Sequence, residues 1–406
     1  MYQFKTDEMR VPAKIWSTEG EIEEGCLQQV RNLAALPFAH HHVVLNPDGH
    51  LGYGMPVGGV LAAKGYIVPN AVGVDISCGM IARRTNLHAE QLQEPHKSGG
   101  TVIQNVLGQI MRAVPVGMPP GGVHKEPQPL GDELSALLYP VETGPPGIVK
   151  ALGVAPYQLG TLGSGNHFIE LQVDESNQVW VMLHSGSRAL GKAVCDHFNK
   201  QADELNERYF SVVPKKWELA FLPIDDELGR QYLTWLDICL KYGELNRQRM
   251  VERVTNALAS VTPDIEIEET IQTHHNYAAL ENHFSANVWV HRKGACRARA
   301  GELVIIPGSM ETGSYIARGL GNAESLQSCS HGAGRRMSRT AARKVRTVQD
   351  MVESMKAKGI ALATHKVGSV LDEAGHAYKN VDDVMALQQD LVAPVHKLRP
   401  LGVVKG

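Results

Sequence analysis

The stretch "VGVDISCGM", residues 72–80, places Asp75 and Cys78 three positions apart among apolar residues and glycines. A lone cysteine in such surroundings is most often a buried structural thiol. A thiol beside a carboxylate is also a partial metal site, which histidines from elsewhere in the chain would have to complete. The stretch therefore leaves two alternatives, and the remainder of the sequence has to decide between them.

The overall composition is that of a globular protein. The chain has 406 residues, 43% of them apolar, and a formal net charge of −3, so affinity for nucleic acid would have to come from local basic patches. No apolar run is long enough to span a bilayer, and the start "MYQFKTDEMR" lacks an apolar signal core, so we expect a cytoplasmic location. The six cysteines form no CxxC pair, which favours a reducing compartment over a disulfide framework.

Local patterns predict a mixture of strands and helices. Short apolar runs broken by Gly and Pro predict strands at "HHHVVL", "VGGVLAA", "GYIVP" and "AVGVDI" within 40–85, and again at 178–188, 287–295 and 302–309. Helical spacing predicts helices over 101–113, 189–209, 226–260, from "SHGAG" to about 358, and over 381–398. Because no regular βαβ alternation appears, we expect an α+β fold instead of a Rossmann or TIM plan.

The region near 115–130, which includes most of the stretch "VGMPPGGVHKEPQPLGD" (residues 116–132), is rich in Pro and Gly. This composition is typical of a surface loop, and we interpret it as an insertion within a single domain that covers residues 1–406.

Several segments share one design, in which a predicted strand ends and a His, Cys or Asp stands at the junction. Besides Asp75 and Cys78, they are "PDGHLGYG" with Asp48 and His50, "GSGNHFIE" with His167 and Glu170, "MLHSGSR" with His184, "THHNY" with His274 and His275, and "CSHGAG" with His331. One such histidine is weak evidence, but six junctions in one chain favour a site for a divalent transition metal. Ligand softness alone favours zinc, iron or cobalt over manganese, and a thiolate can bridge two ions.

Two further motifs concern phosphate. "GSRALGKA", residues 186–193, nearly matches a P-loop, but Ala193 stands where a hydroxyl should hold magnesium, so we interpret it as a false positive whose Arg188 can still contact phosphate. "CSHGAGRRMSRTAARKVR", residues 329–346, predicts a Gly-rich turn that leads into a helix N-terminus, a favourable position for an anion.

Two stretches are basic and contain no acidic residue. Between Arg335 and Arg346 there are six basic residues, and "HRKGACRAR", residues 291–299, contains four. A solvated helix face accounts for some of these side chains. In a chain of net charge −3, the two stretches together predict a polyphosphate or RNA ligand.

Taken in order, the motifs resemble those of the RtcB family of RNA-splicing ligases, which join RNA 3′-phosphate or 2′,3′-cyclic phosphate ends to 5′-hydroxyl ends. The resemblance runs from about residue 10 to the terminal "VVKG". It is carried by "PDGHLGYG", "VGVDISCGM", "GTLGSGNHFIE", "MLHSGSR", "HHNY", "RKGA", "IIPGSM", "RGLGN", "SCSHGAGRRMSR" and "AYKNVDDVM".

The resemblance implies a role for each matching residue. Cys78 bridges two Mn²⁺ ions, His184 and His275 complete the ligands of one ion, and Asp75 and His167 complete those of the other. His331 is the nucleophile that takes GMP from GTP and passes it to the RNA 3′-phosphate, after which the 5′-hydroxyl attacks and GMP leaves. The implied nucleotide-binding residues are Asn166, Glu170, Asn276, Ser309, Ser314, His331, Gly332, Gly334, Tyr378 and Lys405, and the implied RNA or phosphate contacts are Arg188, Arg335 and Asp48.

The chain departs from the family pattern at three positions. Gly49 stands where an apolar residue is expected, and Ser77 and Glu311 stand where glycines are expected. The resemblance places Glu311 beside the GTP phosphates, so we expect its charge to weaken nucleotide binding. We interpret these departures as those of a divergent bacterial paralogue that repairs cleaved RNA instead of splicing tRNA.

The sequence thus predicts one α+β domain of mixed β-sheets flanked by helices around a central metal cleft. The predicted function is a GTP- and Mn²⁺-dependent RNA ligase acting in RNA repair or tRNA splicing. One alternative is a metal-dependent RNA cyclic phosphodiesterase, which would need Cys78 and the histidines but neither His331 nor Lys405. The other is a non-catalytic RNA-binding protein, which would need the basic stretches and no converging ligands.

Overall fold

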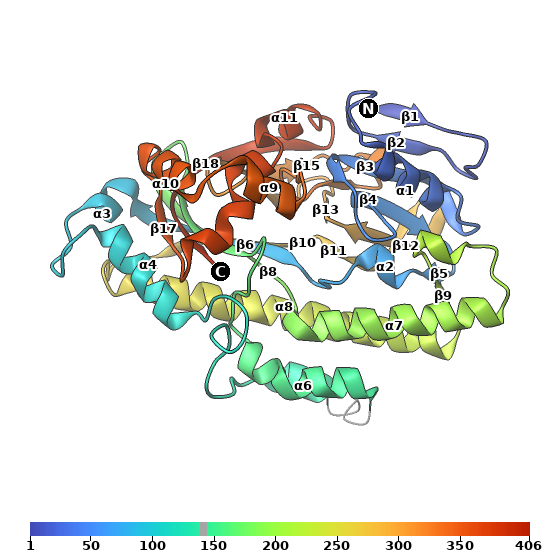
Figure 1. Ribbon diagram of the computed structural model, residues 1–406, viewed down its shortest axis with the longest axis horizontal. Coiled ribbons are helices and arrows are strands. Elements are labelled where there is room, and N and C mark those ends of the chain that lie inside the picture. The colour runs from blue at the N-terminus through green and yellow to red at the C-terminus, as the bar shows by residue number, and fades with distance from the viewer. Residues whose placement is uncertain (139–143) are drawn as a thin grey trace.

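Two mixed β-sheets form the framework of the computed structural model, which describes residues 1–138 and 144–406 (Figure 1). In spatial order, the six-stranded sheet contains β1 Tyr2–Phe4, β2 Ala13–Ile15, β3 Ala39–His50, β4 Val57–Ala63, β12 Ala286–Lys293 and β11 Asn276–His283. The eight-stranded sheet contains β10 Ile267–His274, β6 Gly79–His88, β8 Gln178–Ser185, β7 Phe168–Val173, β18 Val392–Lys405, β15 Ser314–Gly319 and β14 Leu303–Ile306, with β17 Ala361–Ala363 paired to β18. Two short pairs complete the strands, β13 Ala295–Arg297 with β16 Ser328–Ser330 and β5 Tyr66–Ile67 with β9 Leu222–Pro223.

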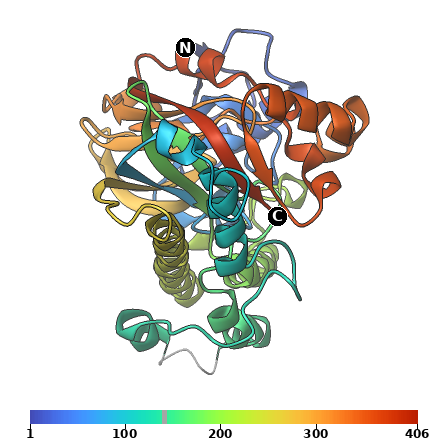
Figure 2. The same ribbon diagram turned by 90° about the vertical axis from the view of Figure 1, so that its left-hand side faces the viewer.

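Helices cover the eight-stranded sheet on one side. The long helix α8, Glu227–Ala259, lies against β6 and β8, α7, Arg188–Arg208, lies beside it, and α6, Pro146–Gln158, is outermost (Figures 1 and 2). The remaining helices are α1 Glu24–Ala34, α2 Pro69–Val72, α3 Ala89–Gln93, α4 Val102–Ala113, α5 Asp132–Leu138, α9 Arg339–Val345, α10 Val348–Ala357 and α11 Val381–Ala386. Short 3₁₀ segments are η2 Lys215–Trp217, η3 Ala323–Ser325, η4 Val367–Glu373 and η5 Gly375–Ala377.

The central strands are buried on both faces. Every residue of β8, "QVWVMLHS", is buried, because its Val179, Val181 and Leu183 pack toward α4 and α8 while Trp180 and Met182 pack toward β14 and β15. Burial of both faces explains why this strand is apolar almost throughout instead of alternating. A further cluster of buried apolar side chains contains residues of both sheets, so it fixes the position of one sheet relative to the other.

The predicted fold class is confirmed, since mixed β-sheets are flanked by helices. The helices expected over 101–113, 189–209 and 226–260 correspond to α4, α7 and α8 within one residue at each end. Residues 114–131 contain no helix or strand beyond an isolated bridge at Val116, whereas their description as an insertion in a single domain stays a prediction. None of the helices in the described part of the chain combines the length and apolar content needed to cross a membrane.

Three expectations about secondary structure are wrong. "AVGVDI" does not form a strand, because α2 ends at Val72 and a turn follows with Gly73 at φ +97°. The helix expected over 381–398 is the short α11 followed by strand β18, which begins at Val392. The helix expected directly after "SHGAG" begins only at Arg339, because residues 334–336 instead pair with the backbone of residues 377–379.

Candidate active site

The ends of four neighbouring strands meet at one edge of the eight-stranded sheet. Cys78 directly precedes β6, His167 precedes β7, His184 lies at the end of β8 and His275 follows β10. Since these strands run antiparallel to their neighbours, alternate starts and ends share that edge, and the register pairs Gly79 with both Ser185 and His274. Antiparallel pairing therefore gathers ligands that are separated by up to two hundred residues in the sequence.

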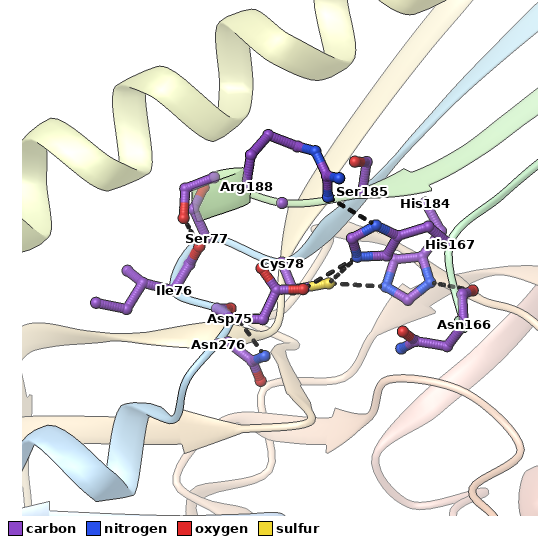
Figure 3. A network of polar contacts seen from close by, with 12 residues as sticks. Asp75, Ile76, Ser77, Cys78, Asn166, His167, His184, Ser185, Arg188 and Asn276 are labelled. Carbon is purple, nitrogen blue, oxygen red and sulfur yellow. Dashed lines mark hydrogen bonds and ion pairs between the residues drawn. The ribbon is translucent and has the colours of Figure 1, made fainter. Parts of the chain in front are cut away.

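Cys78 is shared by two groups of potential metal ligands. One group is Cys78, His184 and His275, and the other is Asp75, Cys78 and His167. In the first, His184 Nε2 lies 3.1 Å from both Cys78 Sγ and His275 Nε2. In the second, His167 Nε2 lies 3.5 Å from Cys78 Sγ and 3.0 Å from Asp75 Oδ2. Figure 3 shows the Asp75, Cys78, His167 and His184 side chains pointing toward one another.

Backbone carbonyls orient two of these imidazoles. His167 Nδ1 donates to Leu162 O at 2.9 Å, and His184 Nδ1 donates to Asn166 O at 3.2 Å. The Nε2 of His184 therefore carries a lone pair that faces the sulfur, which is how metal-binding histidines are usually held. Ligands about 2.1 Å from a shared ion lie roughly 3–3.5 Å apart, so this donor set fits a divalent ion.

Burial sets the protonation of the ligands in the free protein. Burial and then the neighbouring histidine charges lower the pKa of His184 and His275 well below the usual range, which keeps both rings neutral. Burial acts to raise the pKa of Asp75, but the hydrogen bond and charge of His167 and the charge of Arg188 outweigh it and lower the pKa to about 2. Burial and the Asp75 charge raise the pKa of the Cys78 thiol well above normal, so a bound cation would have to displace its proton.

His331 stands beside the metal ligands with its ring held by Asp48. The ring centroids of His331 and His275 are 4.8 Å apart. Asp48 Oδ2 accepts hydrogen bonds from His331 Nδ1 at 2.6 Å and from its backbone N–H at 3.1 Å. With Nδ1 bonded to Asp48, the other ring nitrogen, Nε2, has no hydrogen-bond partner among residues 1–138 and 144–406, and His331 lines the pocket.

The expectation that Asp48 contacts an RNA phosphate does not fit this position. Its side chain is fully buried, lies behind the His331 ring and does not line the pocket. A carboxylate in that place orients the imidazole instead of meeting a phosphate. The sequence grouped Asp48 with the basic residues, because nothing local reveals a contact with a histidine 283 residues later.

A pocket opens from the metal ligands and His331 toward the C-terminal strand. Its lining includes the following residues predicted for nucleotide: Asn166, Glu170, Asn276, Ser309, Gly332, Gly334, Tyr378 and Lys405, and it also includes Arg335. Ser314 does not line it, since its side chain is buried in hydrogen bonds with Gln172 and Gly308. Arg188 does not line it either, and its guanidinium lies 3.3 Å from His167 Nδ1.

Glu373 is a pocket residue that the sequence did not single out. Its buried carboxylate accepts a hydrogen bond from Tyr378, pairs with Arg339 and lies 3.2 Å from Arg335 and 3.5 Å from Lys405. The attraction of Lys405 and Arg339 outweighs burial and lowers the pKa of Glu373, so the carboxylate is ionised among its cations. Two adjacent acids in "LDEAG" carry no sequence signal, whereas Arg339 was visible only as one of a basic run.

The two basic stretches are largely neutralised by acids from elsewhere. Arg339 and Arg343 pair with Asp372, and Arg346 pairs with Glu311. In the other stretch, Arg292 is fully buried against Glu281 and Arg297 pairs with Glu302. Two of the four cations in the stretch 291–299, Arg292 and Lys293, are buried, and Arg297 is paired, so this stretch offers an RNA less free charge than its sequence suggests.

Two of the departures from the family pattern have local explanations. At Gly49, a Cβ atom would lie 2.8 Å from the Leu45 side chain, which fills the available space. Ser77 adopts φ +65°, a left-handed conformation that favours glycine, and its Oγ donates to Leu240 O at 3.1 Å. Gly243 makes room for it, since a Cβ there would lie 2.3 Å from Ser77 Oγ.

The third departure overturns an expectation. Glu311 does not line the pocket, and its carboxylate accepts hydrogen bonds from Arg346 at 2.7 Å and 2.9 Å. Burial acts to raise the pKa of Glu311, but the hydrogen bonds from Arg346 and Gly375 outweigh it and lower the pKa. The premise that this charge faces the phosphates is wrong, because the carboxylate points away and is paired.

Glu170 makes the stability of the free protein depend on pH. Burial raises its pKa from 4.5 to about 7. Between pH 4.5 and 7, the folded state keeps the Glu170 proton, whereas the unfolded state releases it. The free energy of unfolding therefore falls as the pH rises through this range, by roughly 3 kcal/mol in total. We expect the melting temperature of Glu170→Gln, relative to that of the wild type, to be higher at pH 8 than at pH 5. An equal difference at both pH values would contradict the assignment.

Comparison with known proteins places this geometry in a family. The model of the family described as tRNA-splicing ligase RtcB matches residues 29–138 and 148–406. The chain is 40% identical over 421 aligned positions to the RNA-splicing ligase RtcB of Escherichia coli K12, covering 100% of both chains. It is 31% identical to the tRNA-splicing ligase RtcB of Methanococcus maripaludis, covering 98% of this chain and 96% of the relative, and 32% identical to that of Thermococcus kodakarensis, covering 98% and 95%. The chain belongs to the RtcB family of RNA-splicing ligases.

Proposed function

We propose that this protein is a GTP- and Mn²⁺-dependent RNA ligase that joins a 3′-phosphate or 2′,3′-cyclic phosphate end to a 5′-hydroxyl end through a GMP–His331 intermediate. The observation that carries the proposal is the position of His331. Its Nε2 lone pair is free, its other nitrogen is held by Asp48, and its ring lies 4.8 Å from that of the ligand His275. An oriented neutral imidazole beside a cation site is the arrangement that phosphoryl transfer to histidine requires.

Cys78, Asp75, His167, His184 and His275 would hold two ions, with the sulfur common to both. Bound Mn²⁺ would offset negative charge on the phosphoryl oxygens. The choice of manganese comes from the family resemblance, since the soft thiolate and imidazole set alone favours zinc, iron or cobalt.

The chain's own residues perform the transfer steps. His331 Nε2 attacks the α-phosphorus of GTP, the P–O bond to the β-phosphate breaks, and pyrophosphate leaves with the electron pair. The N–P bond to His331 then breaks as an oxygen of the RNA 3′-phosphate takes GMP. Finally the 5′-hydroxyl oxygen attacks the activated 3′-phosphate, loses its proton and expels GMP. Asp48 keeps Nδ1 protonated throughout, so His331 presents the same nitrogen at each step.

Polar and charged groups in the pocket lining support the binding of guanine nucleotide. Tyr378, Lys405 and Glu170 line the pocket, and Lys405 is held 3.5 Å from Glu373. A hydroxyl, an ammonium and a carboxyl group can read the polar edge of a purine base. We also propose that Arg335, which lines this pocket and the neighbouring one beside Arg336, meets the phosphate of an RNA end. A cytoplasmic location and a role in repair instead of tRNA splicing stay predictions.

The source of the junction phosphate tests the reaction. We expect ligation of RNA carrying ³²P in its 3′-phosphate, with unlabelled GTP and Mn²⁺, to place the label inside the joined strand, where phosphatase cannot remove it. RNA with a 5′-phosphate and a 3′-hydroxyl serves as the matched control and should not be joined. Joining of the control RNA alone would refute the proposal and would assign the other class of RNA ligase.

A further inference from the structure

Glu311 lies directly behind the wall of the pocket. Its neighbours Ser309 and Met310 line the pocket, whereas the Glu311 side chain points away from it and is 4% exposed. The Glu311 backbone N–H donates to Ser309 Oγ at 3.3 Å, so the two residues are held together within one tight turn. Met310 is anchored separately, in the apolar cluster formed with α10 and η4.

The carboxylate joins this turn to two other segments. From α9–α10, Arg346 donates at 2.7 Å and Ser354 Oγ donates at 2.7 Å. From the start of η5, the Gly375 backbone N–H donates at 3.0 Å. The fit against Gly375 is close, because a Cβ there would lie 3.2 Å from Glu311 Cβ and 3.3 Å from Ser309 Oγ.

The segment tied by the Gly375 N–H carries two pocket residues. Glu373 precedes Gly375 by two positions and Tyr378 follows it by three, and both line the pocket. Glu373 in turn contacts Arg335, Arg339 and Lys405. The Glu311 carboxylate is thus the common acceptor for Arg346, Ser354 and the Gly375 N–H, and the Glu311 backbone N–H donates to Ser309. These bonds join the turn of Ser309 to α9–α10 and to the segment that presents Glu373 and Tyr378.

We infer that Glu311 is a positioning residue for nucleotide binding, which fixes Ser309, Glu373 and Tyr378 relative to one another without touching the nucleotide. This inference rests on the proposed function. The inferred effect of Glu311 on nucleotide affinity is the opposite of the effect predicted from the sequence, in which the charge of Glu311 repels the phosphates. The chain has an acid in place of the expected glycine, and Arg346 and Ser354 donate hydrogen bonds to it.

The test compares Glu311→Gly and Glu311→Gln with the wild type. We expect Glu311→Gly to raise the KM for GTP in His331 guanylylation about tenfold, the factor that the loss of one charged hydrogen bond produces. The kcat at saturating GTP and the Mn²⁺ content should stay unchanged, because the metal ligands and His331 lie on other segments. Glu311→Gln keeps an acceptor for the Gly375 N–H and should recover most of the affinity.

Glu281→Gln is the matched control. Glu281 is also a buried carboxylate paired with an arginine, Arg292, but it does not line the pocket or contact its walls through Gly375. The control should lower the melting temperature and leave the KM for GTP unchanged. An unchanged or lowered KM in Glu311→Gly, or an equal rise in the control, would overturn the inference.

Hydrogen exchange separates this inference from the proposed function. In Glu311→Gly without nucleotide, the amides of residues 375–378 should exchange faster than in the wild type, while those of β11 should not. Unchanged exchange at 375–378 would overturn the positioning role whatever the enzyme's activity. Absence of any GMP adduct in the wild type would instead overturn the proposed function, and the exchange result would still decide the role of Glu311.

Discussion

We expect replacement of His331 with alanine to abolish the covalent GMP adduct and to lower RNA joining by about 10⁴-fold or more, because His331 is the nucleophile of the proposed first step. Metal binding should persist, since the ligands come from the ends of β6, β7, β8 and β10. The adduct is followed with α-³²P-labelled GTP on a denaturing gel. A phosphoramidate at His331 should be lost in acid and survive in alkali.

His331→Asn is the matched variant for folding. Alanine leaves the buried Asp48 carboxylate without its partner, whereas the asparagine amide can still donate to Asp48 Oδ2. Both variants should be inactive, and the asparagine variant should melt closer to the wild type. An adduct that persists in either variant would place the nucleophile elsewhere.

Asp48→Asn separates orientation from nucleophilic attack. The amide can no longer keep Nδ1 of His331 as the donor in the same way, so the lone pair at Nε2 is no longer assured. We expect the adduct to form about 10²-fold to 10⁴-fold more slowly, with GTP affinity little changed. A rate equal to that of the wild type would remove Asp48 from the reaction.

Replacement of Cys78 with alanine should remove both metal ions, because Cys78 is the one member common to the two ligand groups. We expect metal affinity to fall by about 100-fold or more and ligation to be lost with it. The measurement is metal content per chain by elemental analysis after dialysis. Retention of two ions in Cys78→Ala would refute the shared role.

Two comparison variants sharpen that result. His275→Ala alters only the group with His184 and should leave one ion bound, whereas Cys195→Ala removes another buried free cysteine, in α7, that belongs to neither group. We expect no bound ion in Cys78→Ala, one in His275→Ala and two in Cys195→Ala. This graded result would distinguish a shared sulfur from a general loss of structure. If Cys78→Ala and His275→Ala lose the same single ion, Cys78 serves one site only.

The chemistry of the site was visible in the sequence because its residues stand at strand ends. Asp75, Cys78, His167, His184 and His275 each flank an apolar run, and strand ends are where a sheet presents side chains to a common edge. The family resemblance then assigned their roles. Those roles and the choice of Mn²⁺ and GTP stay predictions, whereas the strands and the convergence of the donors are observed.

The sequence by itself determined the residue types of the site and several elements, since α7 and α8 follow from apolar periodicity and β8 from a continuous apolar run. Only the tertiary structure decided which charges are paired and where they point. Glu311 and Arg346 are 35 residues apart, and Asp48 and His331 are 283 apart, so no local pattern encodes either contact. A short-range sequence pattern predicts which residues are buried. The electrostatic role of a side chain, however, depends on the partner that folding brings beside it. Basic stretches that contain no acid in the sequence are therefore neutralised by acids from other segments in the fold.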